Sequence, residues 1–151
     1  MTELIGTTLD SISHRLYVGS LNYSPSFLVV NLKGMAGHSL QKLIDLAIGR
    51  AVVIGGTQSA SETDLLVSVK DALYFQGDDG SHPDRGYLAS VEFQRNAELV
   101  MFEMDKLVDG ADTIMSFWLK EGHPFYPVFW DFAFLIEKNN DAIVFIGSSS
   151  D

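Results

Sequence analysis

The last stretch of the chain carries two apolar segments that constrain the fold more than any other part of the sequence. In the first, Val128–Glu137, both alternating faces are apolar, with Val128, Trp130, Phe132, Phe134 and Ile136 on one and Phe129, Ala133 and Leu135 on the other. Lys138-Asn139-Asn140 separates it from the second, Asp141–Gly147, which contains the run Ile143–Ile146. A hairpin with two apolar faces must be covered on both sides, and an open edge would favour aggregation. We therefore predict a C-terminal β-hairpin in the centre of a sheet.

Three shorter apolar runs in the first third of the chain are typical of strands. Leu16-Tyr17-Val18 and Phe27–Leu32 lie between Gly, Ser, Asn and Pro residues, which commonly bound strands, and the second run is the clearer. Ala51–Ile54 has the length and composition of a short buried strand, and Gly55-Gly56 is expected to end it. The sequence thus predicts three strands before residue 56.

Helical periodicity is clearest over Ser39–Ile48. Its apolar residues recur on one helical face: Leu40, Leu43, Ile44, Ala47 and Ile48. Ser39 can cap the first amides, and Gly49 can stop the helix in a left-handed conformation. Another helix is predicted at Asp109–Lys120, where Gly110 weakens the start.

The segment Ser61–Gln76 fits two structures. Its longer apolar stripe is helical and comprises Leu65, Leu66, Val69, Ala72 and Leu73. Ser61 and Asp64 also have capping-box spacing. Yet Leu65, Val67 and Val69 alternate as in a strand. We favour a helix because its stripe is longer.

The middle of the chain contains a loop and a pattern typical of a second hairpin. Gly77–Gly86 is rich in Gly, Asp, Ser and Pro, which predicts a loop. Tyr87–Gln94 alternates apolar and polar residues, Arg95-Asn96-Ala97 can turn, and Glu98–Met104 can return as a strand. The predicted fold is therefore α+β: one domain over residues 1–151 with a mostly antiparallel sheet, two or three helices packed on it, and the C-terminal hairpin central.

Composition narrows the classes of protein further. The chain has no cysteine, so disulfides, thiolate metal sites and a cysteine nucleophile are excluded. Its first residues lack the basic start and apolar run of a secretory signal, and no apolar stretch approaches the ~20 residues of a membrane span. We expect a soluble, cytoplasmic, bacterial protein without a membrane association.

Negative charge is unevenly distributed along the sequence. Residues 1–55 carry three acids and four bases, whereas residues 56–151 carry 17 acids and six bases, a net charge of −11. A nucleic-acid-binding protein normally needs a basic face, so we expect no nucleic-acid partner. An acidic surface favours fast association with a basic protein.

Motifs for catalysis and metal binding are absent from the sequence. His14, His38, His82 and His123 show no paired ligand spacing, so no zinc site is predicted, and no cofactor motif occurs. The acids of the Gly77–Gly86 loop lack the EF-hand spacing, which predicts a solvated loop rather than a cation site. No catalytic residue is assigned, and an enzyme is the less favoured class.

Carboxylates supply the remaining candidate residues. We predict partner contacts at Asp78, Asp79, Asp84, Glu92 and Glu103, in the polar loop and on the predicted Tyr87–Met104 hairpin. In an alternative, a small α+β enzyme or ligand-binding domain would use a pocket whose acid–base groups are Asp131, Glu92, His82 or His123. The plainer interpretation is that these carboxylates point to the solvated side of the sheet.

The end of the chain resembles bacterial toxin-immunity proteins. The resemblance rests on the acidic one-domain build, the aromatic strand, the polar turn, the run Ala142–Ile146 and the ending Gly147–Asp151, which we expect to be frayed. It implies a protein that blocks one cognate toxin by tight binding, with complementary charge to a basic toxin domain. A homo-oligomer using Phe125 and Tyr126 as contacts is a third alternative.

Overall fold

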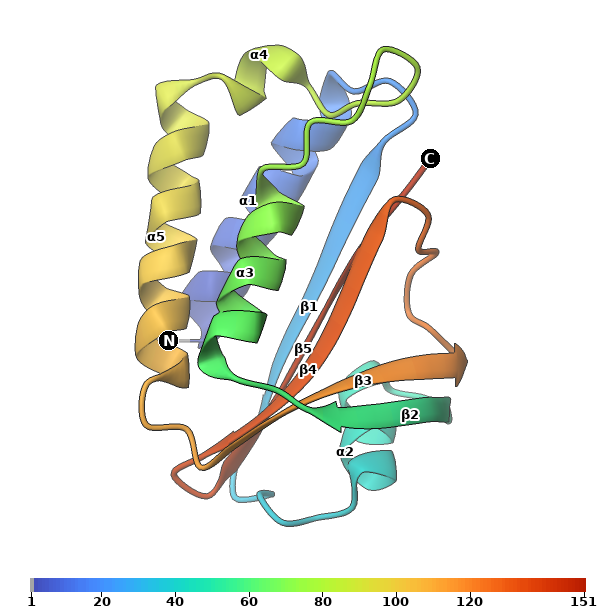
Figure 1. Cartoon of the computed structure of the whole chain (residues 1–151), viewed down its shortest axis with the longest axis vertical. Helices are drawn as coiled ribbons and strands as arrows, with labels where there is room; N and C mark the ends of the chain where they lie inside the picture. Colours follow the sequence, from blue (N-terminus) through green and yellow to red (C-terminus); the bar gives the residue numbers. More distant parts are fainter. Residues whose placement is uncertain (1) are drawn as a thin grey trace.

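The computed structural model describes residues 2–151 as one antiparallel sheet with helices on both faces (Figure 1). The strand order is β1-β5-β4-β3-β2, and every neighbouring pair is antiparallel. The strands are β1 Ser24–Leu32, β2 Val53–Ser59, β3 Thr113–Glu121, β4 Trp130–Lys138 and β5 Asp141–Ser150. This confirms the predicted α+β class and the predicted strands at Phe27–Leu32 and in the C-terminal hairpin.

The C-terminal hairpin is central, as predicted. Strand β5 lies between β1 and β4, and β4 has β3 on its other side. Its two apolar faces enter two different cores: Phe134 and Phe145 belong to the core under α1, α3 and α5, whereas Val144 and Ile146 belong to the core that includes Leu43 and Ile44 of α2. The hairpin is apolar on both faces because helices cover it on both sides.

Five helices accompany the sheet over the described range: α1 Thr2–Val18, α2 Leu40–Ile48, α3 Glu62–Leu73, α4 Arg85–Leu88 and α5 Val91–Val108. Figure 1 shows α1 and α3 beside the sheet, with α5 farther from it. Helix α5 contacts both α1 and α3. Its outer side is therefore free of the rest of the fold.

The predicted helices at Ser39–Ile48 and Ser61–Gln76 are confirmed as α2 and α3. Ser39 Oγ accepts from the Lys42 N–H at 3.2 Å, and Gly49 takes the left-handed conformation that ends α2. Ser61 and Asp64 form the capping box of α3, with distances of 2.9 and 3.0 Å.

The predicted strand at Leu16-Tyr17-Val18 is wrong, because these residues end α1. The buried residues of this helix are Ile5, Leu9, Ile12 and Leu16, spaced four, three and four apart. That stripe is helical, and the helix packs along β1. The apolar triplet at its end is a continuation of the helix rather than a separate strand.

The predicted hairpin at Tyr87–Met104 is also wrong. Arg85–Leu88 is the short helix α4, and Val91–Val108 is the 18-residue helix α5. The buried residues of α5 include Phe93, Ala97, Val100 and Met104, which recur at helical spacing. Glu92 and Glu103 therefore lie on a helix. A short alternating pattern was outweighed by a longer helical stripe that packs against α1 and α3.

The predicted helix at Asp109–Lys120 is a strand, β3. Helix α5 ends at Val108, and Lys138 Nζ donates to the terminal carbonyls of Lys106, Leu107 and Asp109 at 2.9, 3.2 and 2.6 Å. Gly110 then has a positive φ of 71° and turns the chain. The strand forms because β4 and β2 supply hydrogen-bonding partners that the local sequence does not reveal.

Strand β2 differs from the buried Ala51–Ile54 strand that the sequence predicts. It begins at Val53, passes through Gly55-Gly56 and continues to Ser59. It is an edge strand paired only with β3, and Val53 is 42% exposed. The glycines do not end the strand because β3 continues to pair with it, from Gly56 opposite Trp118 to Ser59 opposite Met115.

The predicted fraying of Gly147–Asp151 is wrong for most of this segment. Ser148–Ser150 belong to β5, and Ser148 and Ser149 are buried. Strand β1 pairs with them, with Ser24 opposite Ser150.

The Gly77–Gly86 loop is confirmed up to Asp84, which is the N-cap of α4. No helix over residues 2–151 is long and apolar enough to span a membrane.

Candidate functional site

The sheet divides where β3 leaves β4. The two strands pair only from Thr113↔Glu137 to Ser116↔Phe134. Beyond that point β3 stays paired with β2 as far as Glu121, and β4 stays paired with β5 as far as Trp130. Figure 1 shows β3 and β2 turning away from β4 toward the right of the view.

This division leaves backbone groups without strand partners on both sides of the gap. In an antiparallel sheet, alternate residues direct their N–H and C=O groups to opposite neighbours. Alternate residues of Trp130–Ala133 on β4 and of Phe117–Glu121 on β3 therefore direct these groups into the gap. They form an internal pair of open strand edges.

A cleft of ≈ 390 Å³ occupies the gap on the side of α3. We call it the divergence cleft. Its walls come from β2 and the residue after it, α3, β3 and β4: Gln58, Ser59, Ala60, Asp64, Ser68, Ser116, Phe117, Trp118, Asp131, Phe132, Ala133 and Phe134. The cleft combines hydroxyl groups, carboxylates, aromatic rings and unpaired backbone.

Trp118 is the largest exposed side chain of this cleft, at 52% exposure. Its indole lies over the two glycines of β2. A Cβ on Gly55 would come within 2.7 Å of the ring, and a Cβ on Gly56 within 2.0 Å. The glycines therefore provide a flat seat that holds one face of the indole against β2.

The residues that line the cleft include two acids and no basic residue. Asp64 stands at the start of α3, where it accepts from the Ser61 N–H at 2.9 Å. The hydrogen bonds with the backbone and side chain of Ser61 hold the Asp64 pKa below its usual value. Asp131 is exposed on β4, and its side chain alternates with that of Phe132, so it lies on the α2 face of the strand. A cation is the charge that complements this cleft.

His123 lies near Asp131, in the segment that joins β3 to β4. Burial lowers the His123 pKa, while its hydrogen bond with the Phe125 backbone and the charge of Asp131 act in the opposite direction. The Phe125 N–H donates to His123 Nδ1 at 3.0 Å. The ring thus holds the connecting segment in place.

The predicted loop acids gather at the opposite end of the helical layer, and each has a structural partner. Asp78 Oδ1 accepts from the N–H groups of Gly80 and Ser81 at 2.8 and 3.0 Å. Asp79 pairs with Arg85 at 3.0 Å, and Asp84 caps α4 by accepting from the Tyr87 N–H at 3.1 Å. These acids order their own loop.

The two predicted glutamates are also paired. Both carboxylate oxygens of Glu92 accept from Arg15 at 3.0 Å, and the Arg15 guanidinium lies 4.5 Å from the centre of the Tyr87 ring. Glu103 is buried and pairs with Lys106 at 3.0 Å. Glu92 lies at the same end as the loop acids, whereas Glu103 lies farther along α5.

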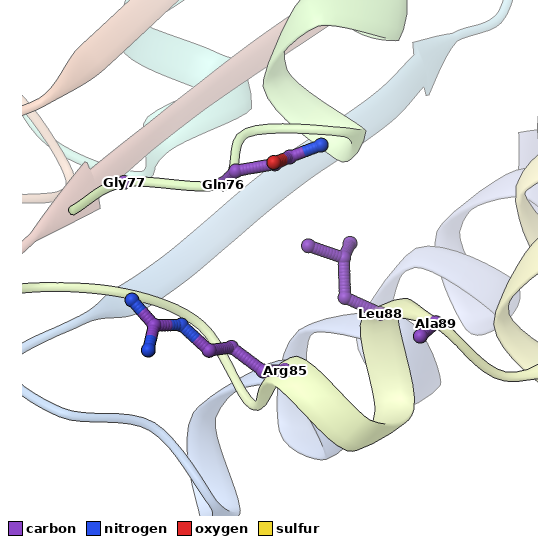
Figure 2. Close-up of a pocket in the computed structure, with 5 residues that line it drawn as sticks. All are labelled: Gln76, Gly77, Arg85, Leu88 and Ala89. Atoms are coloured by element: carbon purple, nitrogen blue, oxygen red, sulfur yellow. The ribbon is translucent and has the colours of Figure 1, made fainter. Parts of the chain in front are cut away.

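A second cleft, of ≈ 310 Å³, lies beside the same loop and is lined by Gln76, Gly77, Arg85, Leu88 and Ala89 (Figure 2). Figure 2 shows the side chains of Arg85 and Leu88 projecting from α4, with the Gln76–Gly77 segment across the cleft. Arg85 is engaged by Asp79 and by the Asp78 carbonyl, at 3.0 and 3.2 Å. This cleft therefore offers little unpaired charge.

The four acid–base candidates of the alternative do not form one pocket. Asp131 and His123 lie near the divergence cleft, whereas Glu92 pairs with Arg15 and His82 with Leu21 in the loop region. Within residues 2–151, no side-chain hydrogen bond joins any two of the four. The described part of the chain also contains no group of three or more potential metal ligands among His, Cys, Asp and Glu.

The structure places most of the net charge on α3, α4, α5 and the segments that connect them. Residues 62–112 hold twelve acids and four bases, a net of −8 out of −10 for the whole chain. They form α3, α4, α5 and the connecting segments. Most of the negative charge that the sequence places in residues 56–151 therefore lies in these helices and their connecting segments.

Exposed apolar side chains interrupt this acidic layer on α5. Val91, Arg95, Glu98, Phe102 and Asp105 are exposed and recur four, three, four and three residues apart, so they share one helical face. We call this set the α5 outer face. Phe102 is 62% exposed, with Lys106 Nζ 5.0 Å from its ring centre.

The sequence analysis predicted neither the α5 outer face nor the role of Trp118 in the divergence cleft. The α5 outer face was missed because the segment was assigned to strands, and its spacing in the sequence is the signal that could have found it. Trp118 was missed because its seat requires β2 to pair with β3, which no local pattern indicates. Only the divergence of the strands makes it part of a cleft.

Comparisons with known proteins add no family. No protein-family model matches the chain, and no curated protein sequence matches it. A crystal structure of citrus MAF1 is similar over 97% of this chain and 98% of that one, with 13% identity and a TM-score of 0.38. A similarity of that size carries no argument about fold or function.

Proposed function

We propose that this chain is a non-enzymatic binding protein that inhibits a basic protein partner, as an immunity protein neutralises a bacterial toxin in the cytoplasm. The observation that carries the proposal is the α5 outer face: an exposed helix surface on which the large aromatic side chain of Phe102 lies between the acids Glu98 and Asp105. The C-terminal resemblance to immunity proteins agrees with the same role.

The charge of the helical layer supports a basic partner. A net charge of −8 over residues 62–112 attracts a basic protein and raises the rate of encounter. We expect Asp79 and Glu92 to contribute less to recognition than Glu98 and Asp105, since Arg85 and Arg15 pair with them. Glu98 and Asp105 lie on the exposed side of α5 without a basic side chain paired to them among the described residues.

Phe102 supplies the apolar part of such an interface. Exposed aromatic residues surrounded by polar ones are typical centres of protein interfaces, where a few side chains carry most of the binding energy. Val91 lies on the same face and is 71% exposed. Neither side chain is needed by the core, so a role in binding accounts for their exposure.

The test uses the product of a toxin-like gene beside the gene for this chain. We expect coexpression to rescue growth, and purified proteins to bind in calorimetry. Phe102→Ala should weaken binding by about tenfold or more, since it removes a central aromatic contact. Glu98→Gln with Asp105→Asn should slow association and reduce its salt dependence.

Asp10→Asn is the matched control, because Asp10 is an exposed acid on α1 that lies beside residues of β1, away from α5 and from the divergence cleft. It should bind like the wild type. If no neighbouring gene product binds, or if the α5 variants bind as tightly as the control, the proposal is wrong.

A further inference from the structure

We infer that the divergence cleft binds an extended, arginine-containing segment of the partner, with the guanidinium on Trp118 and the segment's backbone on the open edge of β4. This inference rests on the proposed function, because it assigns a second contact to the same basic partner. It uses a region of the chain that is separate from the α5 outer face.

The open strand edges favour an extended backbone. Alternate residues of Trp130–Ala133 direct N–H and C=O groups into the cleft, where β3 no longer pairs with them. A peptide that adds to a strand edge gains main-chain hydrogen bonds and places alternate side chains in neighbouring pockets. The edge is short, so it suits a segment of a few residues.

Trp118 selects the side chain that such a segment would carry. One face of its indole rests on Gly55-Gly56, and the ring is 52% exposed beside the cleft. A cation over an indole face is attracted by the ring, and tryptophan is the strongest of the aromatic residues in this respect. The glycine seat fixes the ring in position before any ligand binds.

The charges of the cleft point to a cation as well. Asp64 lines it on the side of α3, where the Trp118 ring also lies, and no lysine or arginine lines it. The guanidinium of arginine is planar, so it can stack on the indole while its N–H groups reach carboxylates or carbonyl groups. Lysine is a compact charge without that planar match, so the cleft should prefer arginine.

The experiment titrates the ¹⁵N-labelled full chain with the blocked tripeptide Ac-Val-Arg-Val-NH₂ and follows it by NMR. The chain has two tryptophans, so it gives two indole N–H signals. We expect saturable shifts of the Trp118 indole and of the amides of Trp130–Ala133. The Trp130 indole, which donates to Tyr23 at 2.9 Å, should stay in place.

Variants separate the two parts of the recognition. Trp118→Leu should abolish the shifts, and Asp64→Asn should weaken binding by about threefold to tenfold. Asn at position 64 keeps an oxygen for the Ser61 N–H, so α3 stays capped. Unchanged amide spectra away from the cleft confirm that each variant is folded.

Three results would overturn the inference: no saturable shift up to the solubility limit of the peptide, equal affinity for Ac-Val-Leu-Val-NH₂, or full affinity in Asp64→Asn. The Glu98→Gln/Asp105→Asn protein is the control and should titrate like the wild type. The tripeptide assay needs no partner protein. It can therefore fail while the partner still binds at α5, and it can succeed while no partner binds at α5.

Discussion

At the scale of single residues, several charged side chains in this protein complete local backbone structure. Asp64 and Asp84 cap helices, and Lys138 caps the end of α5. The Glu137 carboxylate accepts hydrogen bonds from the Thr113 hydroxyl at 2.9 Å and from the Gly37 N–H at 2.5 Å. The second bond holds the β1–α2 connection against the sheet. Each of these groups satisfies a backbone donor or acceptor that a helix end or a turn leaves free. These side chains therefore stabilise the fold whether or not a partner is bound.

Lys138 provides the sharpest test at this scale. Its ammonium donates to three carbonyl groups at the end of α5, where the helix dipole also favours a positive charge. Lys138→Met keeps the apolar stem and removes the donors, so we expect a loss of about 1 kcal/mol in the free energy of unfolding. Urea denaturation measures it, with Lys120→Met on exposed β3 as the control. Equal stability of the two variants would contradict the capping role.

At the scale of elements, the pairing of β2 with β3 explains features that neither strand explains alone. Strand β2 pairs with β3, and the Trp118 ring of β3 also lies over two glycines of β2. The α3–α5 contact is of another kind: the Tyr74 and Phe93 rings meet edge to face at 5.3 Å. The glycines are needed because any side chain there would occupy the space of the indole. The cleft therefore depends on small residues in β2 as much as on Trp118.

Gly56→Ala tests this dependence. The added Cβ would lie 2.0 Å from the indole, so the ring must leave its seat. Because Trp118 is half exposed, the ring can move at a cost in unfolding free energy below about 1 kcal/mol. We expect a large shift of its indole N–H signal. Gly6→Ala on α1, where the space is empty, should leave that signal in place and raise stability by about 0.5–1 kcal/mol. An unmoved indole in Gly56→Ala would contradict the seat.

At the scale of the whole molecule, the sheet separates two cores that share one hairpin. The larger core lies under α1, α3 and α5, and the smaller lies under α2. Adjacent residues of β5 enter different cores: Phe145 enters the larger and Ile146 the smaller, and both are fully buried. The two cores should therefore unfold together.

Alanine substitutions on β5 test that coupling. Phe145→Ala and Ile146→Ala should cost about 3–5 and 2–5 kcal/mol respectively, since each leaves a cavity in a packed core. Both variants should show one transition that coincides in far- and near-ultraviolet circular dichroism. Val67→Ala, at an exposed position of α3, should change stability by less than about 0.5 kcal/mol. A separate early transition in Ile146→Ala would show that the α2 side unfolds independently.

The sequence by itself determined the features that depend on local physics. The caps of α2 and α3 follow from Ser39 and Ser61, and the central hairpin follows from residues 128–147, whose apolar pattern leaves no solvated face. Only the tertiary structure decided that Val91–Val108 is a helix, that Thr113–Glu121 is a strand, and that β3 departs from β4. In those segments the local pattern fits two structures, and the packing partners that select one lie far away in the sequence. The final hairpin is thus readable from the chain alone, whereas the cleft beside it exists only once distant strands have paired.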